Sequence, residues 1–191
     1  MNQKNLLEVD WSKIPAPADD GAAAHLVGMT IPPVSLIATD DTSVTLAALS
    51  GRTVVFAYPR TGEPGKISLV DDWDMIPGAR GCTPQTCAFR DLFAELKAAG
   101  AGQVFGLSTQ SNTYQAEMAS RLHLPFPVLS DEKLELSRAL ALPTMQVAGL
   151  TMMKRLALVI DDARITHVFY PVFPPDRNAG DVLAWLKDNP V

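Results

Sequence analysis

The feature that most constrains this fold is the alternation of short apolar runs with amphipathic stretches of helical length. "RTVVFAYP" (52–59) and "QVFGLS" (103–108) are nearly continuous apolar runs, which are typical of strands buried on both faces of a sheet. Between them, residues 83–99 carry Phe89 and Leu96 at helical spacing. Strands that alternate with helices in this way indicate an α/β sandwich.

The rest of the chain continues this alternation. We predict further strands and helices, with a β-hairpin near the C-terminus: strands at 34–39, 43–46, 126–129, 155–161 and 164–170, and helices at 111–124, 131–142 and 179–188. The expected fold class is therefore α/β with a mixed central sheet. Residues 1–25 contain few large apolar groups and are interpreted as an N-terminal extension, and residues 26–191 as one domain.

The composition excludes several classes of partner. The 16 Lys and Arg against 21 Asp and Glu leave a net charge of −5, which argues against nucleic-acid binding. No apolar run is long enough to cross a bilayer, and the first 26 residues lack the apolar centre of a secretory signal. We therefore expect a cytoplasmic protein with no membrane partner, in a compartment where a close cysteine pair is more often redox-active than structural.

The only two cysteines, Cys82 and Cys87, lie five positions apart at the start of the predicted helix 83–99. Thr83 fits its N-cap and Pro84 its first helical position. The unpaired N–H groups and the dipole at a helix N-terminus favour an anion, and a thiol attacks as its thiolate. Cys82 is therefore the candidate nucleophile.

The spacing of the two cysteines suggests a switch. Five residues on an ideal helix place two Cα atoms roughly 8–9 Å apart, whereas disulfides rarely form beyond about 7 Å. Either the first helical turn unwinds or Cys82 lies just outside the helix. This geometry favours a cycle in which the Cys82 thiolate attacks an electrophilic oxygen and becomes a sulfenic acid, Cys87 condenses with it to a disulfide, and an external dithiol reduces the bridge.

Other interpretations of the cysteine pair remain open at this point. A structural disulfide is disfavoured, because such a small loop constrains little of the unfolded chain. A zinc site is disfavoured, because no histidine lies at ligand spacing from the two thiols. Two unrelated buried thiols are the main alternative, since free cysteine is among the most buried residue types.

Several segments resemble one known family. "GCTPQTCAFRD" is similar to the peroxidatic segment of peroxiredoxins of the Q type, also called bacterioferritin comigratory proteins. The resemblance continues in the same order along residues 26–188, through "VVFAYPR", "GLSTQS", "LPFPVLSDEKLELSRALAL" and "RLALVIDDARI".

The resemblance implies a thioredoxin-like fold and a peroxidase that acts on hydrogen peroxide and small organic hydroperoxides. It implies Cys82 as the peroxidatic cysteine, Cys87 as the resolving cysteine, and Arg155 as the arginine that stabilises the thiolate and the peroxide. A thioredoxin-type protein would supply the electrons, and no metal, haem or flavin is implied. We expect a monomer or a weak homodimer.

Three features depart from the family pattern. Ala79 stands three residues before Cys82, where the family has a hydroxyl that orients the peroxide, and Thr61 is a candidate to fold back and replace it. Gln85 stands where a glutamate is frequent. Residues 60–81 form a loop much longer than the pattern allows.

Two other functions stay open because of these departures. A thiol–disulfide oxidoreductase acting on proteins would use a redox pair, although the usual Cys-x-x-Cys spacing is absent. A non-catalytic redox sensor is compatible with Ala79 and with the long loop.

Overall fold

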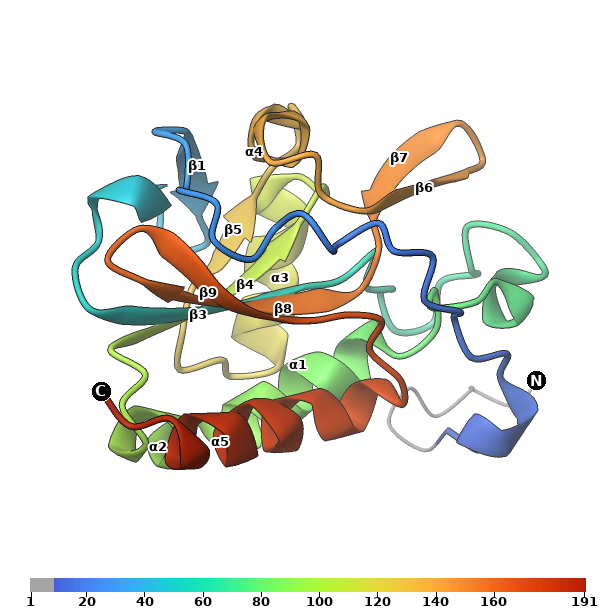
Figure 1. The fold of residues 1–191 in the computed structure, drawn as a ribbon. Helices are drawn as coiled ribbons and strands as arrows, with labels where there is room; N and C mark the ends of the chain where they lie inside the picture. Colours follow the sequence, from blue (N-terminus) through green and yellow to red (C-terminus); the bar gives the residue numbers. More distant parts are fainter. Residues whose placement is uncertain (1–8) are drawn as a thin grey trace.

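The computed structural model describes residues 9–191 and places a seven-stranded sheet at the centre of the molecule (Figure 1). The strand order is β2-β1-β5-β4-β3-β8-β9, in which β4 is parallel to β3 and β5, and all other neighbours are antiparallel. The bounds of the strands are β1 (Ser35–Ala38), β2 (Ser43–Thr45), β3 (Arg52–Ala57), β4 (Gln103–Ser108), β5 (Val128–Ser130), β8 (Leu156–Asp161) and β9 (Arg164–Phe169).

Helices cover both faces of this sheet, with α1, α2 and α5 side by side below it in Figure 1 and α4 above it. Their bounds are α1 (Cys82–Asp91), α2 (Phe93–Ala98), α3 (Asn112–Arg121), α4 (Glu135–Ala139) and α5 (Asn178–Asp188), with short 3-10 helices η1 (Trp11–Lys13), η2 (Leu46–Ala48), η3 (Trp73–Met75) and η4 (Pro175–Arg177). The expected α/β class with a mixed sheet is confirmed.

Strand β3 shows why the sheet needs cover on both faces. Successive side chains point to opposite faces, so Val55 belongs to one apolar cluster and Val54 and Phe56 to the other. The Phe56 ring stacks on Phe89 of α1 with centroids 4.0 Å apart. This contact anchors α1, which carries both cysteines, on the sheet.

The helix expected over 83–99 is wrong in two respects. It is divided into α1 and α2 at Leu92, and Phe89 of α1 and Leu96 of α2 belong to the same apolar cluster. Its N-cap is Gly81 rather than Thr83, so Cys82 lies inside the helix, and Pro84 is the third helical residue instead of the first.

Two other elements differ from the prediction. Helix α4 is much shorter than 131–142, because the Asp131 carboxylate accepts hydrogen bonds from the backbone N–H groups of Leu136 and Ser137 and delays the helix start. A two-stranded hairpin, β6 (Thr144–Val147) and β7 (Leu150–Met153), was not predicted. It projects from the sheet just before Arg155 (Figure 1).

The predicted N-terminal extension lies against the domain where the structure describes it, in residues 9–25. Ala23 belongs to an apolar cluster of the core, and Asp20 accepts hydrogen bonds from Lys154 and from the Tyr170 hydroxyl. Residues 1–8 of the extension lie outside the described residues, and the boundary at residue 25 stays a prediction. None of the helices in residues 9–191 combines the length and apolarity needed to span a bilayer.

Candidate active site

The site begins at the sharp turn that starts α1. Gly81 has φ +104° and ψ 18°, a left-handed backbone that side-chain-bearing residues rarely adopt. Its carbonyl oxygen accepts from the Gln85 N–H at 3.0 Å, which closes the first helical turn. Gly81 is the N-cap residue and, as a glycine, has no side chain to cap this helix. The N-terminal N–H groups therefore remain available to an anion near Cys82.

Arg155 is brought directly to the sulfur of Cys82. Its Nη2 donates to Cys82 Sγ at 3.3 Å, and both residues are buried, with 2% and 3% of their surface exposed. In its thiol form, Sγ in turn donates to the carbonyl oxygen of Ala79 at 3.5 Å. The two residues are 73 positions apart in the sequence, so the fold alone creates this contact.

The other hydrogen bonds of Arg155 all go to neutral oxygens. Nη2 donates to the carbonyl oxygens of Gly78, Ala79 and Arg80 at 3.2, 3.3 and 3.1 Å. Nη1 donates to the side-chain oxygen of Gln85. Among the described residues, no carboxylate forms an ion pair with the guanidinium, so its charge is solvated by dipoles and not cancelled by an anion.

Gln85 is held in turn by a residue that sequence reasoning missed. Its Nε2 donates to Asn178 Oδ1 at 2.9 Å, and both side chains are buried. Asn178 begins α5, 93 positions from Gln85. In the sequence, an asparagine at a helix start looks like an ordinary cap, and only its burial against α1 distinguishes it.

A small cavity of about 30 Å³ lies over Cys82 and includes Thr61 in its wall. The Thr61 hydroxyl donates to Gln110 Oε1 at 3.2 Å, and the Thr61 N–H donates to the same oxygen at 2.9 Å. The structure thus places Thr61 beside Cys82 although 21 residues separate them in the sequence. Its hydroxyl is fixed by Gln110 and has lone pairs left to accept a hydrogen bond.

The long loop 60–81 forms the walls of a larger groove, of about 500 Å³, that continues from this cavity. The cavity and the groove share five lining residues: Arg60, Thr61, Gly62, Trp73 and Arg80. Trp73 is buried in one apolar cluster with Ala79 and so anchors the loop, whereas Met75 is exposed. The loop therefore extends the site outward from Cys82.

The remaining arginines near the cysteines have other partners. Arg80 lies 3.5 Å from Asp74 in an ion pair, and Arg60 stacks over the Tyr114 ring. Arg90 pairs with Asp91 and donates to the backbone carbonyl of Leu122. Arg155 alone of these donates to a cysteine sulfur.

Cys87 lies in the same continuous helix as Cys82 and is also buried, with 6% of its surface exposed. Both thiols are free. Ideal helix geometry puts their Cα atoms roughly 8–9 Å apart, beyond disulfide range. Burial in the helix raises the pKa of the Cys87 thiol above its usual 9.0, so this thiol is neutral near pH 7.

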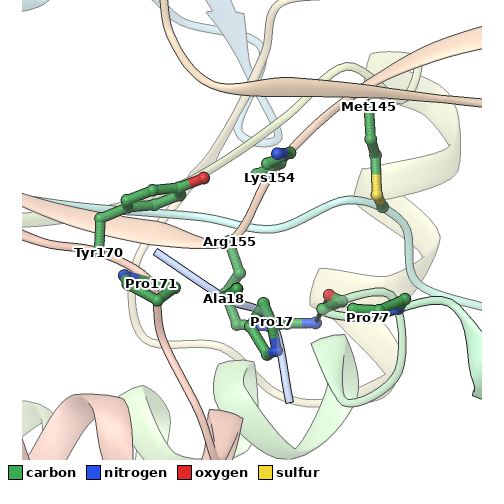
Figure 2. A pocket seen from close by; sticks show the side chains of 9 residues that line it. Pro17, Ala18, Pro77, Met145, Lys154, Arg155, Tyr170 and Pro171 are labelled. Atoms are coloured by element: carbon green, nitrogen blue, oxygen red, sulfur yellow. Dashed lines mark hydrogen bonds between the residues drawn. The ribbon is translucent and has the colours of Figure 1, made fainter. Parts of the chain in front are cut away.

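A separate cavity of about 110 Å³ lies against Arg155 (Figure 2). Met145 of β6 projects into it, as do residues of the N-terminal extension, whereas Met152 and Met153 are buried in the core. Its walls are Pro17, Ala18, Pro77, Gly78, Met145, Lys154, Arg155, Tyr170 and Pro171. Residues 9–191 contain no cluster of three or more His, Cys, Asp or Glu able to hold a metal ion.

Comparison with known proteins decides the family. Residues 26–183 match the model of the family described as Redoxin. A relative from Sedum lineare named "Peroxiredoxin Q, chloroplastic" is 30% identical over 162 residues, which cover 84% of this chain and 77% of the relative. The chain belongs to the redoxin family, as a peroxiredoxin of the Q type.

Further relatives agree with this assignment. Peroxiredoxin Q from Triticum aestivum is 29% identical and covers 91% of this chain and 75% of its own. Among solved structures, peroxidoxin BcpB from Mycobacterium tuberculosis has a TM-score of 0.67 at 26% identity, covering 86% of this chain and 98% of that one. A cysteine-to-serine mutant of PrxQ from Xylella fastidiosa has the same TM-score, 0.67, at 21% identity, covering 85% and 95%.

Membership in the peroxiredoxins establishes the reaction class. The protein is a thiol-dependent peroxidase, as the sequence resemblance predicted, and its substrate is a peroxide. The thioredoxin-like fold is likewise confirmed by these solved structures.

The raised pKa of Cys87 generates a test of its burial. In a Cys82→Ser variant, we expect iodoacetamide to alkylate Cys87 slowly at pH 8 and faster only as the pH rises above 9. As the pH rises, the Cys87 thiol loses its proton at a lower pH in the unfolded chain than in the folded protein. The stability that the buried neutral thiol contributes is therefore fully present below pH 9.0 and is lost above it. Mass spectrometry of the alkylated peptide measures the rate, with the same variant in urea as the control. Half-maximal alkylation of the folded variant below pH 9 would contradict the assignment.

Proposed function

We propose that this peroxiredoxin reduces hydrogen peroxide and small organic hydroperoxides with Cys82 as the nucleophile and Cys87 as the resolving thiol. The observation that carries the proposal is the 3.3 Å contact between Arg155 Nη2 and Cys82 Sγ. A guanidinium is always charged near neutral pH, so at this distance it stabilises an anionic sulfur. The hydrogen-bond acceptors of Arg155 are neutral, so they do not cancel the positive charge that the sulfur experiences.

In the first step, the Cys82 thiolate attacks the nearer oxygen of the hydroperoxide. A sulfur–oxygen bond forms, the oxygen–oxygen bond breaks, and the departing oxygen takes a proton and leaves as water or an alcohol. The sulfur is oxidised by two electrons to a sulfenic acid, and the peroxide is reduced. Arg155 and the N–H groups at the start of α1 stabilise the negative charge on the departing oxygen.

Thr61 completes the peroxide site in this proposal. It supplies the hydroxyl that Ala79 lacks, because it lines the same cavity as Cys82. Gln110 fixes its orientation, so a lone pair of the Thr61 oxygen accepts the hydrogen bond of the peroxide O–H.

In the second step, Cys87 attacks the sulfur of the oxidised Cys82. A sulfur–sulfur bond forms, the sulfur–oxygen bond breaks, and water leaves after taking a proton. The start of α1 must unwind for the two sulfurs to meet, and unwinding exposes Cys87 to solvent, which removes the cause of its raised pKa. Opening of the helix therefore also activates the resolving thiol.

The cycle closes when a thioredoxin-type dithiol reduces the Cys82–Cys87 bridge and is itself oxidised to a disulfide. This requirement agrees with the cytoplasmic setting expected from the sequence, where dithiol reductants are kept reduced. We retain the expectation of a monomer or weak homodimer, because both cysteines of the proposed bridge lie in one chain.

Substitution of each cysteine tests the proposed cycle. We expect Cys82→Ser to abolish peroxide consumption in an assay with thioredoxin and its reductase. Cys87→Ser should consume one equivalent of peroxide and then stall unless an external monothiol is added. Mass mapping without reductant after one equivalent of peroxide should find the Cys82–Cys87 bridge in the unmodified protein.

The outcomes also separate the two other functions. Slow stoichiometric oxidation of the unmodified protein without turnover would indicate a redox sensor. Reduction or exchange of protein disulfides, without peroxide consumption, would indicate a thiol–disulfide oxidoreductase. Normal cycling of Cys87→Ser with thioredoxin would rule out Cys87 as the resolving residue.

The groove along loop 60–81 supports the organic part of the proposed substrate range. The cavity over Cys82 is about as large as one water molecule, whereas the adjoining groove, at about 500 Å³, has room for an organic group. Ile67, Leu69 and Trp73 give it apolar contacts.

Narrowing this groove tests the assignment. A Cβ added at Gly62 meets no atom within 4 Å, so Gly62→Leu introduces bulk into the shared wall without a clash. We expect kcat/KM for cumene hydroperoxide to fall roughly tenfold relative to that for hydrogen peroxide. Gly180→Leu is the matched control, because its Cβ is equally unobstructed and lies outside the groove. An unchanged ratio in Gly62→Leu would show that the groove does not hold the organic group.

A further inference from the structure

Residues of the N-terminal extension lie in contact with the turn that starts α1. A Cβ built on Gly81 would lie 2.7 Å from Trp11 Cη2 and 2.6 Å from Pro175 Cγ, so both side chains press directly on the Gly81 backbone. A Cβ built on Gly78 would lie 3.7 Å from Pro17 Cβ, so Pro17 packs against Gly78 less closely. The extension therefore covers the outer side of residues 78–81, immediately before Cys82.

Trp11 is itself firmly placed. Its Nε1 donates to Asp176 Oδ2 at 2.9 Å, and its ring meets Phe173 edge-to-face with centroids 6.0 Å apart. Both partners lie in the segment that leads into α5, which is a helix in contact with α1. Through these contacts, the Trp11 indole connects the N-terminal extension with η4 and with the start of α1.

Arg155 holds the same turn from within. Its Nη2 donates to the carbonyl oxygens of residues 78–80, and Pro17 and Ala18 lie in front of it in the wall of the adjoining cavity (Figure 2). Residues 78–81 are therefore held between Arg155 on one side and Trp11 and Pro17 on the other.

We infer that Trp11 is a positioning residue that keeps Gly81, and with it Cys82, in the folded arrangement and so slows condensation of Cys82 with Cys87. The inference rests on the proposed function. For the sulfurs to meet, the first turn of α1 must unwind, and Gly81 is the hinge of that turn. Gly81 cannot move outward unless Trp11 or Pro175 gives way.

This role decides between two fates of the oxidised sulfur. While α1 stays folded, a second hydroperoxide can react with the Cys82 sulfenic acid, forming another sulfur–oxygen bond and releasing water or an alcohol. The sulfinic acid that results no longer condenses with a thiol. When α1 opens, Cys87 forms the disulfide instead. By delaying opening, Trp11 makes the enzyme more sensitive to inactivation by excess peroxide.

Trp11→Ala tests the inference. We expect the disulfide to form roughly three to ten times faster than in the unmodified protein, as loss of one aromatic contact allows. The hydrogen peroxide concentration that converts half of Cys82 to sulfinic acid should rise by a similar factor. Rapid quenching with a thiol-blocking reagent, followed by mass spectrometry, measures both quantities. Amide hydrogen exchange within residues 81–85 of the reduced protein, above all at Gln85, whose N–H closes the first turn onto Gly81, should also accelerate.

Matched variants separate positioning from general stability. Lys13→Ala alters the same extension, but Lys13 is exposed and, within residues 9–191, pairs only with Asp10, so disulfide formation should not change. Asp176→Asn weakens the hydrogen bond that holds the indole and should shift disulfide formation in the same direction by less. This milder variant serves if Trp11→Ala fails to fold.

The possible results are distinct. Unchanged disulfide formation in Trp11→Ala or, if that variant does not fold, in Asp176→Asn would overturn the inference, and so would a change of equal size in Lys13→Ala. If the unmodified protein does not react with peroxide at all, the proposed function fails. Hydrogen exchange at 81–85 then still shows whether Trp11 holds the turn, because it needs no peroxide.

Discussion

The structure of this peroxiredoxin depends on one buried contact, between the guanidinium of Arg155 and the sulfur of Cys82. A buried cation is costly unless hydrogen bonds replace its lost water. Here three backbone carbonyls and the Gln85 amide do so, and none of them is an anion. These hydrogen bonds stabilise the guanidinium charge without neutralising it. In our proposal, this charge stabilises the thiolate form of the nearby Cys82 sulfur.

In our proposal, the same contact links reactivity to helix conformation. The carbonyls that Arg155 bonds belong to residues 78–80, so the guanidinium that contacts the sulfur also holds the turn that starts α1. In the proposed cycle, peroxide attack needs this turn folded, whereas the bridge to Cys87 needs it open. Burial raises the pKa of the Cys87 thiol while the turn is folded. Trp11 and Pro175 lie against Gly81, and we infer that these segments, far apart in the sequence, influence the balance between the two states.

Much of this could be predicted from local pattern, and the rest could not for physical reasons. Apolar runs identified the inner strands β3, β4 and β8, because burial on both faces leaves a continuous signal. Spacing and resemblance singled out the cysteines and Arg155, and their roles stay predictions, although the structure shows Arg155 in contact with Cys82. The break at Leu92 could not be predicted from periodicity, because Phe89 and Leu96 keep helical spacing across it. The placement of Asn178 depends on its contact with Gln85, 93 residues away in the sequence. The position of Thr61 depends on its contact with Gln110, 49 residues away.

The most direct measurement of the central claim is the rate at which hydrogen peroxide oxidises Cys82 when Arg155 is altered. In a Cys87→Ser background, stopped-flow mixing isolates the first step from resolution. The account predicts that Arg155→Ala lowers the second-order rate constant by roughly 10²–10³-fold, with Arg155→Lys intermediate because it keeps the charge but not the planar fork. Rate constants for both variants within about twofold of the Cys87→Ser parent would contradict it.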